Sequence, residues 1–410
     1  MFFGALGACL SRKNDDKKAQ FDPEYEGGAR IHDQSVGYGS NKYADRETKR
    51  GVKFVMSPDS LKGYTGLESD ESDTEKKNKK SKFADDLRTP TTLNDSDLEN
   101  GISDMKGKVY KKSDWIKILK NNDLENTSTT ELYASLRQGI PFELRPQIWM
   151  FLAGVDKLKK TEGSISYWEL ANAECTNKED EIQIGKDVDR TFSHNIFFTD
   201  KSYDGKARLT RILRAYVNYD PTIGYSQGMN SFCAALLVIL HPENYSSSQL
   251  KFFETYEKDY EENTFWILVH LMKEKNWRSI YKKDFPKMFE MTKYLEKLIQ
   301  TQLPEIHAAI LASDSTIFDL FHEGFITFLM TYAPLAVGKR IVDLFLIDNE
   351  KLIFNVIIRA LELNKKQIVS INSKYGMQNY IKREMFANLL EKYRKRLYVL
   401  FPFPDAENFQ

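Results

Sequence analysis

An arginine and a glutamine in the middle of the chain have the side-chain chemistry that phosphoryl transfer requires. Arg190 ends the helix expected over residues 178–190, where a polar run begins, so its guanidinium should project from an edge. Gln227 lies between Gly224 and Gly228, just before an apolar run, so its carboxamide should lie on a tight turn that enters a buried helix. A guanidinium can neutralise charge that develops on a phosphate, and a carboxamide can orient an attacking water. The pair therefore predicts a site that supports phosphoryl transfer by positioning and charge stabilisation.

Both residues also have ordinary structural interpretations. Asp187 is three residues before Arg190, so a helix places both on one face, and an ion pair with Asp187 or Asp189 is a common role for such an arginine. The Gln227 carboxamide could instead bond backbone groups of its own turn. Asp187 is expected to orient its neighbours rather than to act as acid or base, since this chemistry needs no strong protein base. The two interpretations of Arg190 are compatible if Asp187 holds the helix end while the guanidinium points outward.

At these positions the sequence resembles the TBC-domain family of Rab GTPase-activating proteins, whose two signatures are I-x-x-D-x-x-R and Y-x-Q-G. The matching residues here are Ile184, Asp187, Arg190, Tyr225, Gln227 and Gly228. The resemblance implies a dual-finger mechanism, in which Arg190 and Gln227 are the catalytic pair and both enter the active site of a Rab-family small GTPase. It also implies that GTP and Mg²⁺ are bound by that partner, so no metal or cofactor of the chain's own is expected. A role in vesicle trafficking, in the cytoplasm or peripherally on endomembranes, would follow.

The resemblance extends from about residue 137 to residue 363. Near its start, the family's R-x-G-I-P and L-R-x-x-x-W patterns match Arg137, Gly139, Ile140, Pro141, Leu144, Arg145 and Trp149. Near its end, Arg340-Ile341-Val342-Asp343-Leu344-Phe345 is similar to the family's R-I-W-D-x-F, with Val342 in place of the usual Trp. We name Arg137, Arg145 and His194 as candidate contacts with the partner, although a single histidine beside a helix end is usually only a hydrogen-bonding loop residue.

The hydrophobic periodicity predicts an all-α domain over residues 107–400, with prolines marking the ends of its helices. Leu209 to Val217 keep the spacing of an amphipathic helix, and the apolar run from Ser231 to Leu240 is too short to cross a bilayer, so it should be a buried central helix. No run of residues has the alternation of a strand. The other expected helices start near Ser113, at Pro141 and at Glu261, or cover residues 164–173, 287–302, 315–332, 335–346, 351–363 and 381–399. Pro146 could kink the first turn of the helix at Pro141 or delay its start.

Composition excludes several other classes of protein. The chain has 59 basic and 59 acidic side chains, so no net field favours nucleic acid or an anionic membrane. Its three cysteines are too few and too scattered for a disulfide framework or a zinc cluster, which fits a reducing compartment. All five tryptophans follow residue 114, so the hydrophobic core should lie in the C-terminal three-quarters of the chain.

Residues 1–106 are expected to form a mostly disordered tail. They contain no Trp and few aliphatic residues, so they cannot bury enough apolar surface to offset the entropy of ordering. The apolar start, with Cys9 before Arg12 and Lys13, could give weak membrane association if Cys9 were acylated, but a frayed terminus explains it equally well. The acidic block at residues 68–75 is usually a solvated charge run, and a phosphorylation switch is the alternative.

Two other functions compete for the same residues. Gly224-Tyr225-Ser226-Gln227-Gly228 also fits G-x-S-x-G, the nucleophile elbow of serine hydrolases, which requires a buried strand before the serine. A helical pattern and Pro221 precede it here, so we expect Ser226 to be a turn residue. The second alternative is a TBC-like scaffold that binds a Rab, or another partner, without accelerating hydrolysis. The presence of both Arg190 and Gln227 favours the activator.

Overall fold

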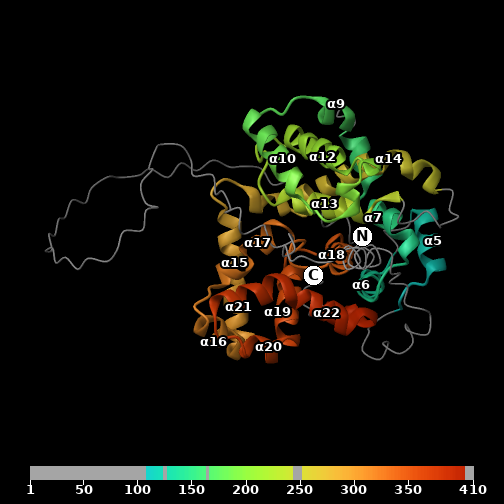
Figure 1. The fold of residues 1–410 in the computed structure, drawn as a ribbon. Coiled ribbons are helices and arrows are strands. Elements are labelled where there is room, and N and C mark those ends of the chain that lie inside the picture. The colour runs from blue at the N-terminus through green and yellow to red at the C-terminus, as the bar shows by residue number, and fades with distance from the viewer. Residues whose placement is uncertain (1–107, 123–126, 163–165, 243–251, 402–410) are drawn as a thin grey trace, which may run out of the picture. The chain divides into compact units, whose positions relative to one another are not determined.

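The computed structural model describes residues 108–122, 127–162, 166–242 and 252–401 (Figure 1). These residues form helices and turns without a single strand, so the predicted all-α class is confirmed for the described part of the chain. The expectations for the tail at 1–106, including the anchor at Cys9 and the acidic block, fall outside the described residues. None of the helices described is long and apolar enough to span a membrane.

The first described helix buries Trp115, and the next leads to the predicted helix start at Pro141. The helix starts four residues later, which is the delay at Pro146 that the sequence left open: Pro141 precedes a short 3-10 turn, and the α-helix begins at Arg145. The reason is Pro146, which has no N–H to donate and so fits only the first turn of a helix. The elements are α5 (Lys112–Asn121), α6 (Thr129–Gln138), η4 (Phe142–Leu144), α7 (Arg145–Leu152), α8 (Val155–Thr161) and α9 (Tyr167–Asn172).

The middle of the chain contains the helices that carry the candidate site. The helix predicted over residues 178–190 is observed with those bounds, and the apolar run forms a helix whose every residue is buried. The stretch between α10 and the next long helix contains two short helical turns. The elements are α10 (Lys178–Arg190), α11 (Ile196–Thr199), η5 (Lys201–Tyr203), α12 (Gly205–Tyr219), α13 (Met229–Ile239), α14 (Phe252–Val269), the π-helical turn η7 (His270–Glu274) and η8 (Trp277–Tyr281).

Glu261 does not start a helix, contrary to the prediction. It lies inside α14, only 1% exposed, where its carboxylate accepts hydrogen bonds from Tyr167, Arg208 and Arg211. Two guanidiniums and a hydroxyl supply the partners that a buried carboxylate needs, so the acid is held by neighbouring elements and not by a helix N-terminus.

The C-terminal half continues with more helices, two of which are shorter than predicted. The helix expected over 315–332 ends at Ile326, because Phe328 and Leu329 adopt positive φ of 54° and 60°. The helix expected over 381–399 is interrupted by a π-helical turn and a 3-10 segment. The elements are α15 (Pro286–Gln302), α16 (Pro304–Ala312), α17 (Ile317–Ile326), α18 (Leu335–Phe345), α19 (Lys351–Leu363), α20 (Lys365–Val369), α21 (Lys374–Asn379), η9 (Tyr380–Glu384), α22 (Met385–Tyr393) and η10 (Arg394–Leu400).

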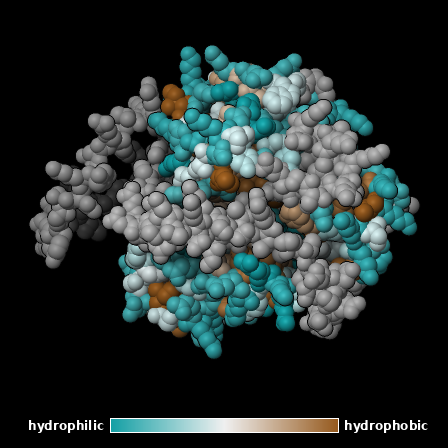
Figure 2. Space-filling view, turned by 45° about the vertical axis from the view of Figure 1, so that its right-hand side comes forward, coloured by the Kyte–Doolittle hydropathy of each residue, from teal (hydrophilic) through white to brown (hydrophobic). Residues whose placement is uncertain are grey.

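Two buried helices join these elements into one core. Helix α13 packs against α10, α12, α14 and α18, while α18 also packs against α6, α19 and α22. In Figure 1, α9, α10, α12 and α13 lie in one group and α15 to α17 with α19 to α22 in another, and α18 lies between the two groups. The face shown in Figure 2 is mainly hydrophilic, and its hydrophobic residues appear as small separate patches. The apolar side chains are buried between the helices, as the periodicity predicts.

Candidate functional site

Helix α10 positions Arg190, and its sequence explains both of its ends. The side chain of Asn177 caps the first turn by accepting from the Glu179 backbone N–H at 3.0 Å, and three acidic residues of that turn complement the positive end of the helix. Ile184 and Val188 are buried on the inner face, which fixes the rotation of the helix. Arg190 is the last helical residue, and its side chain remains 35% exposed.

Asp187 holds the Arg190 guanidinium at the helix end. The Nε and Nη2 atoms of Arg190 lie 3.1 and 2.7 Å from Oδ1 of Asp187, whose side chain is fully buried. The amide of Gln183 donates to the same oxygen at 3.1 Å. The ion pair expected from the sequence is therefore present, and Nη1 of Arg190 makes no hydrogen bond with the described residues. Asp187 thus restrains one edge of the guanidinium while another edge stays available.

The turn that carries Gln227 needs glycine on both sides. Gly224 and Gly228 adopt φ of 63° and 108°, which L-residues with side chains rarely adopt. There is also no room for a Cβ atom: at Gly224 it would lie 2.7 Å from Oδ2 of Asp180, and at Gly228 it would lie 2.7 Å from the Ile326 carbonyl oxygen. The turn is consequently clamped between α10 and the end of α17.

Tyr225 joins this turn directly to the arginine helix. Its hydroxyl donates to Oδ2 of Asp187 at 2.8 Å, while Oδ1 of the same carboxylate receives Arg190. The backbone N–H of Tyr225 also lies 3.3 Å from Oδ2 of Asp180. Burial, reinforced by the adjacent Asp187 charge, raises the pKa of the Tyr225 hydroxyl well above its usual value, so it remains a donor at any physiological pH. One carboxylate therefore fixes Arg190 and the Gln227 turn together.

The Gln227 carboxamide makes no hydrogen bond with the described residues. Its Nε2 atom is buried without an acceptor, so the interpretation that the side chain satisfies its own turn is not supported. An unsatisfied buried donor costs on the order of 1–3 kcal/mol, and such a group in a native protein calls for an explanation. The carboxamide is therefore not used to hold its own turn.

Substituting Gly228 should damage the site more than the fold. In Gly228→Ala, the positive φ and the contact with the Ile326 carbonyl force the turn to move, so we expect a loss of about 1–3 kcal/mol in the free energy of unfolding. If the chain is the GTPase activator that the sequence resemblance implies, its stimulation of GTP hydrolysis should fall by much more than the folded fraction does. Thermal melting and a GTPase assay on the same sample would measure both. Gly185→Ala is the control: nothing lies within 4 Å of its added methyl group, so this exposed helical position should gain about 0.5–1 kcal/mol of stability, and stimulation should stay unchanged.

Three buried polar residues around the turn were not singled out by the sequence analysis. Asp180 is 6% exposed, Thr191 is 4% exposed and Asn230 is 3% exposed. One pattern could have found Asn230: it is a polar residue near the start of an otherwise apolar helix, where an unpaired side chain would be costly. Asp180 and Thr191 have no such pattern, because each looks like an ordinary residue at a helix terminus.

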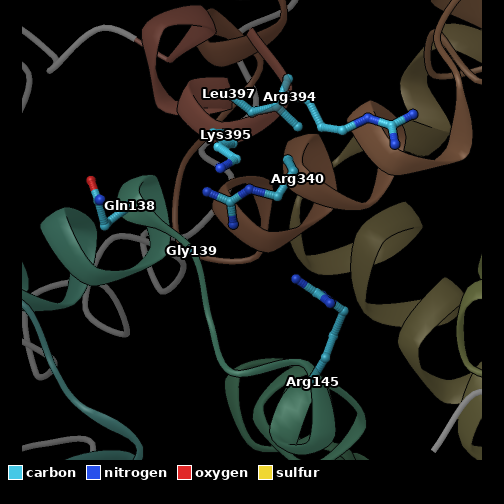
Figure 3. A pocket seen from close by; sticks show the side chains of 7 residues that line it. All are labelled: Gln138, Gly139, Arg145, Arg340, Arg394, Lys395 and Leu397. Atoms are coloured by element: carbon cyan, nitrogen blue, oxygen red, sulfur yellow. The ribbon is translucent and has the colours of Figure 1, made fainter. Parts of the chain in front are cut away.

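The three candidate partner contacts, Arg137, Arg145 and His194, differ in burial and in their bonding partners. Arg145 is buried, 1% exposed, and its guanidinium bonds both oxygens of Asp343, which also accepts from Trp149 and Arg340. Burial alone would raise the pKa of Asp343, but the two guanidiniums lower it below its usual value. Figure 3 shows Arg145 and Arg340 at the pocket between α6, α18 and η10. Arg145 is therefore a residue of the buried core in this structure.

The other two candidates differ in exposure. Arg137 is partly buried, where its Nε donates to the Phe401 carbonyl and its guanidinium lies 5.5 Å from the ring centroid of Tyr398. His194 is exposed just beyond the end of α10, four residues after Arg190. Of the three, only His194 is near the Arg190 helix end in sequence and open to solvent.

The structure does not support Ser226 as the nucleophile of a serine hydrolase, because that role requires a strand before the serine. A turn and helix α12 precede the serine, and the described residues contain no strand that could form an elbow. The Ser226 hydroxyl makes no hydrogen bond with a described histidine. Nor do the described residues bring together three metal-ligating side chains. The geometry favours the interpretation of Ser226 as a turn residue.

The helical arrangement is that of the TBC domains. It is similar to the crystal structure of the Chlamydomonas flagellar RabGAP TBC domain, with a TM-score of 0.56 and 21% identity, over 78% of this chain and 94% of that one. It is also similar to the YPT/Rab-GAP domain of GYP1P, with a TM-score of 0.57 and 20% identity, over 70% of this chain and 94% of that one. The fold therefore defines the class.

Sequence comparison gives the family. The model of the Rab-GTPase-TBC domain matches residues 142–369, more than half of the chain, so the chain belongs to the RabGAP-TBC family. TBC1 domain family member 2A of Mus musculus is 26% identical over 288 residues, 68% of this chain and 29% of the relative. The Ecotropic viral integration site 5 ortholog of Drosophila melanogaster is 25% identical over 273 residues, 67% of this chain and 30% of the relative. The chain thus matches less than a third of each relative's length.

Proposed function

We propose that this protein is a GTPase-activating protein for a Rab-type small GTPase. It supplies Arg190 and Gln227 in trans, while the partner binds GTP and Mg²⁺. In this mechanism the guanidinium neutralises charge that develops on the transferred phosphoryl group, and the carboxamide orients the attacking water. The chain completes the partner's active site and is not itself a hydrolase.

One observation carries the proposal: the buried Asp187 carboxylate is bonded to both catalytic elements. Its two oxygens receive Arg190 and Tyr225, so the guanidinium and the Gln227 turn are fixed relative to each other before any partner binds. Preorganised charge of this kind is what phosphoryl transfer needs, because the protein contributes positioning and electrostatics rather than covalent chemistry.

A scaffold that binds a Rab without accelerating hydrolysis is the second candidate. It requires no particular arrangement of Arg190 and Gln227. Two features are hard to explain under it: the half-free Arg190 guanidinium and the Gln227 carboxamide without an internal bond. The buried Gln227 Nε2 donor has a cost in the isolated protein that a purely structural role would not offset, whereas the exposed edge of Arg190 is solvated without such a cost.

The deciding experiment is single-turnover GTP hydrolysis across a broad panel of purified Rab proteins, with binding measured in parallel. We expect at least one Rab to be stimulated by several orders of magnitude at saturating activator, since trans-acting arginines contribute on the order of 10³ to 10⁵ in rate. Binding to several members of the panel without any stimulation would favour the scaffold instead.

A further inference from the structure

We infer that Thr191 and Asn230 are positioning residues, which fix the Gln227 turn relative to the Arg190 helix end through a buried hydrogen-bond relay. The inference rests on the proposed function, because it concerns the placement of the two catalytic groups. Neither residue belongs to the I-x-x-D-x-x-R or Y-x-Q-G signatures. The relay is also separate from the Asp187 side chain that joins Arg190 to Tyr225.

The relay consists of three consecutive hydrogen bonds. The backbone N–H of Gly228, next to Gln227, donates to Oδ1 of Asn230 at 3.0 Å. Nδ2 of Asn230 then donates to Oγ1 of Thr191 at 2.8 Å. The Thr191 hydroxyl in turn donates to the backbone carbonyl of Asp187 at 2.6 Å. The chain of bonds therefore starts beside one catalytic residue and ends one helical turn before the other.

The orientation of each polar group in the relay is fixed by the group that it bonds. An amide N–H can only donate, so Oδ1 of Asn230 must face Gly228 and Nδ2 must face Thr191. The Thr191 oxygen accepts from Nδ2, and its single proton is directed to the Asp187 carbonyl. Rotation of the Asn230 or the Thr191 side chain would break two bonds at once. Buried bonds of this kind are stronger than exposed ones and hold a single geometry.

Burial makes the relay more than a local capping interaction. Thr191 and Asn230 are 4% and 3% exposed, so water cannot replace a lost bond. Thr191 is the residue after α10 and Asn230 is the second residue of α13, so the relay joins two helices across the site. The Asp187 side chain fixes Tyr225, on one side of Gln227, whereas the relay fixes Gly228, on the other. Gln227 is thus held from both sides.

The central test is Thr191→Val, which keeps the shape of the side chain and removes the hydroxyl. We expect the maximal single-turnover rate of the stimulated Rab to fall about ten- to hundredfold, as small misplacements of catalytic groups do. The activator concentration that gives half-maximal rate should stay unchanged, because the partner surface is intact. Thr191→Ser retains the hydroxyl and should restore most of the rate.

Thr264→Val is a matched control for the loss of a buried hydroxyl. Thr264 is fully buried, and its hydroxyl donates to the carbonyl four residues earlier at 2.6 Å, as that of Thr191 does, but it receives no side-chain amide. Both variants should melt at a lower temperature, Thr191→Val by more, because it also leaves the buried Asn230 amide without an acceptor. Only Thr191→Val should lose maximal rate after correction for the folded fraction.

Asn230→Ala breaks the relay from its other end and completes a double-mutant cycle. If the relay works as a unit, the variant with both substitutions should be no slower than Asn230→Ala alone. Should Thr191→Val fail to fold, Asn230→Ala alone tests the same bond. Independent, multiplicative losses, or a normal maximal rate in either folded variant, would overturn the relay while leaving the proposed function in place. Absence of stimulation by the unmodified chain would refute both.

Discussion

Arg190→Lys should abolish nearly all stimulation of GTP hydrolysis while the protein stays folded and still binds its Rab. Lysine keeps the positive charge, but an ammonium lacks the planar set of donors that lets one edge of the guanidinium bond Asp187 while another faces the phosphate. The expected loss is about 10³- to 10⁵-fold in the maximal rate, or about 4–7 kcal/mol of transition-state stabilisation. Single-turnover hydrolysis at saturating activator measures it.

Arg359→Lys provides a control that matches Arg190 in exposure and pairing. The Arg359 side chain is 36% exposed, and it pairs with Glu362 three residues away, on a helix remote in sequence from the site. This variant should stimulate like the unmodified chain. If Arg190→Lys also kept near-normal stimulation, Arg190 would be a structural residue that only pairs with Asp187, and the finger mechanism would be refuted.

The second large effect concerns Gln227 and a Rab whose own catalytic Gln is replaced by Leu. Small GTPases normally use that Gln to orient the attacking water, and its loss disables hydrolysis even when an arginine is supplied. If the Gln227 carboxamide performs this task, the disabled Rab should still be stimulated. Gln227→Ala should then remove the stimulation, since Arg190 alone neutralises charge but leaves the water without an orienting group.

Four pairings of the two proteins measure this effect. The wild-type and Gln→Leu forms of one Rab are each assayed with unmodified chain and with Gln227→Ala. We expect stimulation of the Gln→Leu Rab by the unmodified chain and a fall to its unstimulated rate with Gln227→Ala. The control variant is Gln302→Ala, at an exposed position at the end of α15. It should stimulate the wild-type and the Gln→Leu Rab as the unmodified chain does. An activator that stimulates only the wild-type Rab, and equally well without Gln227, would work through Arg190 alone.

The sequence was sufficient to predict the elements of the site. Helix α10 has the predicted bounds because its caps, its acidic first turn and its two inward-facing aliphatic residues are all local features. The apolar run of α13 predicted a buried helix because hydrophobicity on every side leaves no face for solvent. Gly224 and Gly228 indicated a tight turn before it. The all-α class followed from the same periodicities.

Elements that depend on distant contacts were predicted less well. Glu261 resembles an acid at a helix start, yet tertiary contacts with Arg208 and Arg211 place it inside α14. Helix α17 ends at Ile326 although the sequence beyond it remains apolar, because the backbone turns at Phe328. Arg145 belongs to a pattern near the start of the family resemblance, but its partner Asp343 lies almost 200 residues later, and their pairing makes it a core residue.

By itself, the sequence determined which residues could act: an arginine at a helix end and a glutamine on a glycine-bounded turn are local features, specified by neighbours in the chain. Only the tertiary structure decided how they are held. Asp187 receives Arg190 from its own helix but Tyr225 from a turn almost forty residues away, and Thr191 meets Asn230 across a similar separation. Such hydrogen bonds depend on how α10 packs against α12 and α13. That packing is set by the burial of the whole core, which no short stretch of sequence encodes.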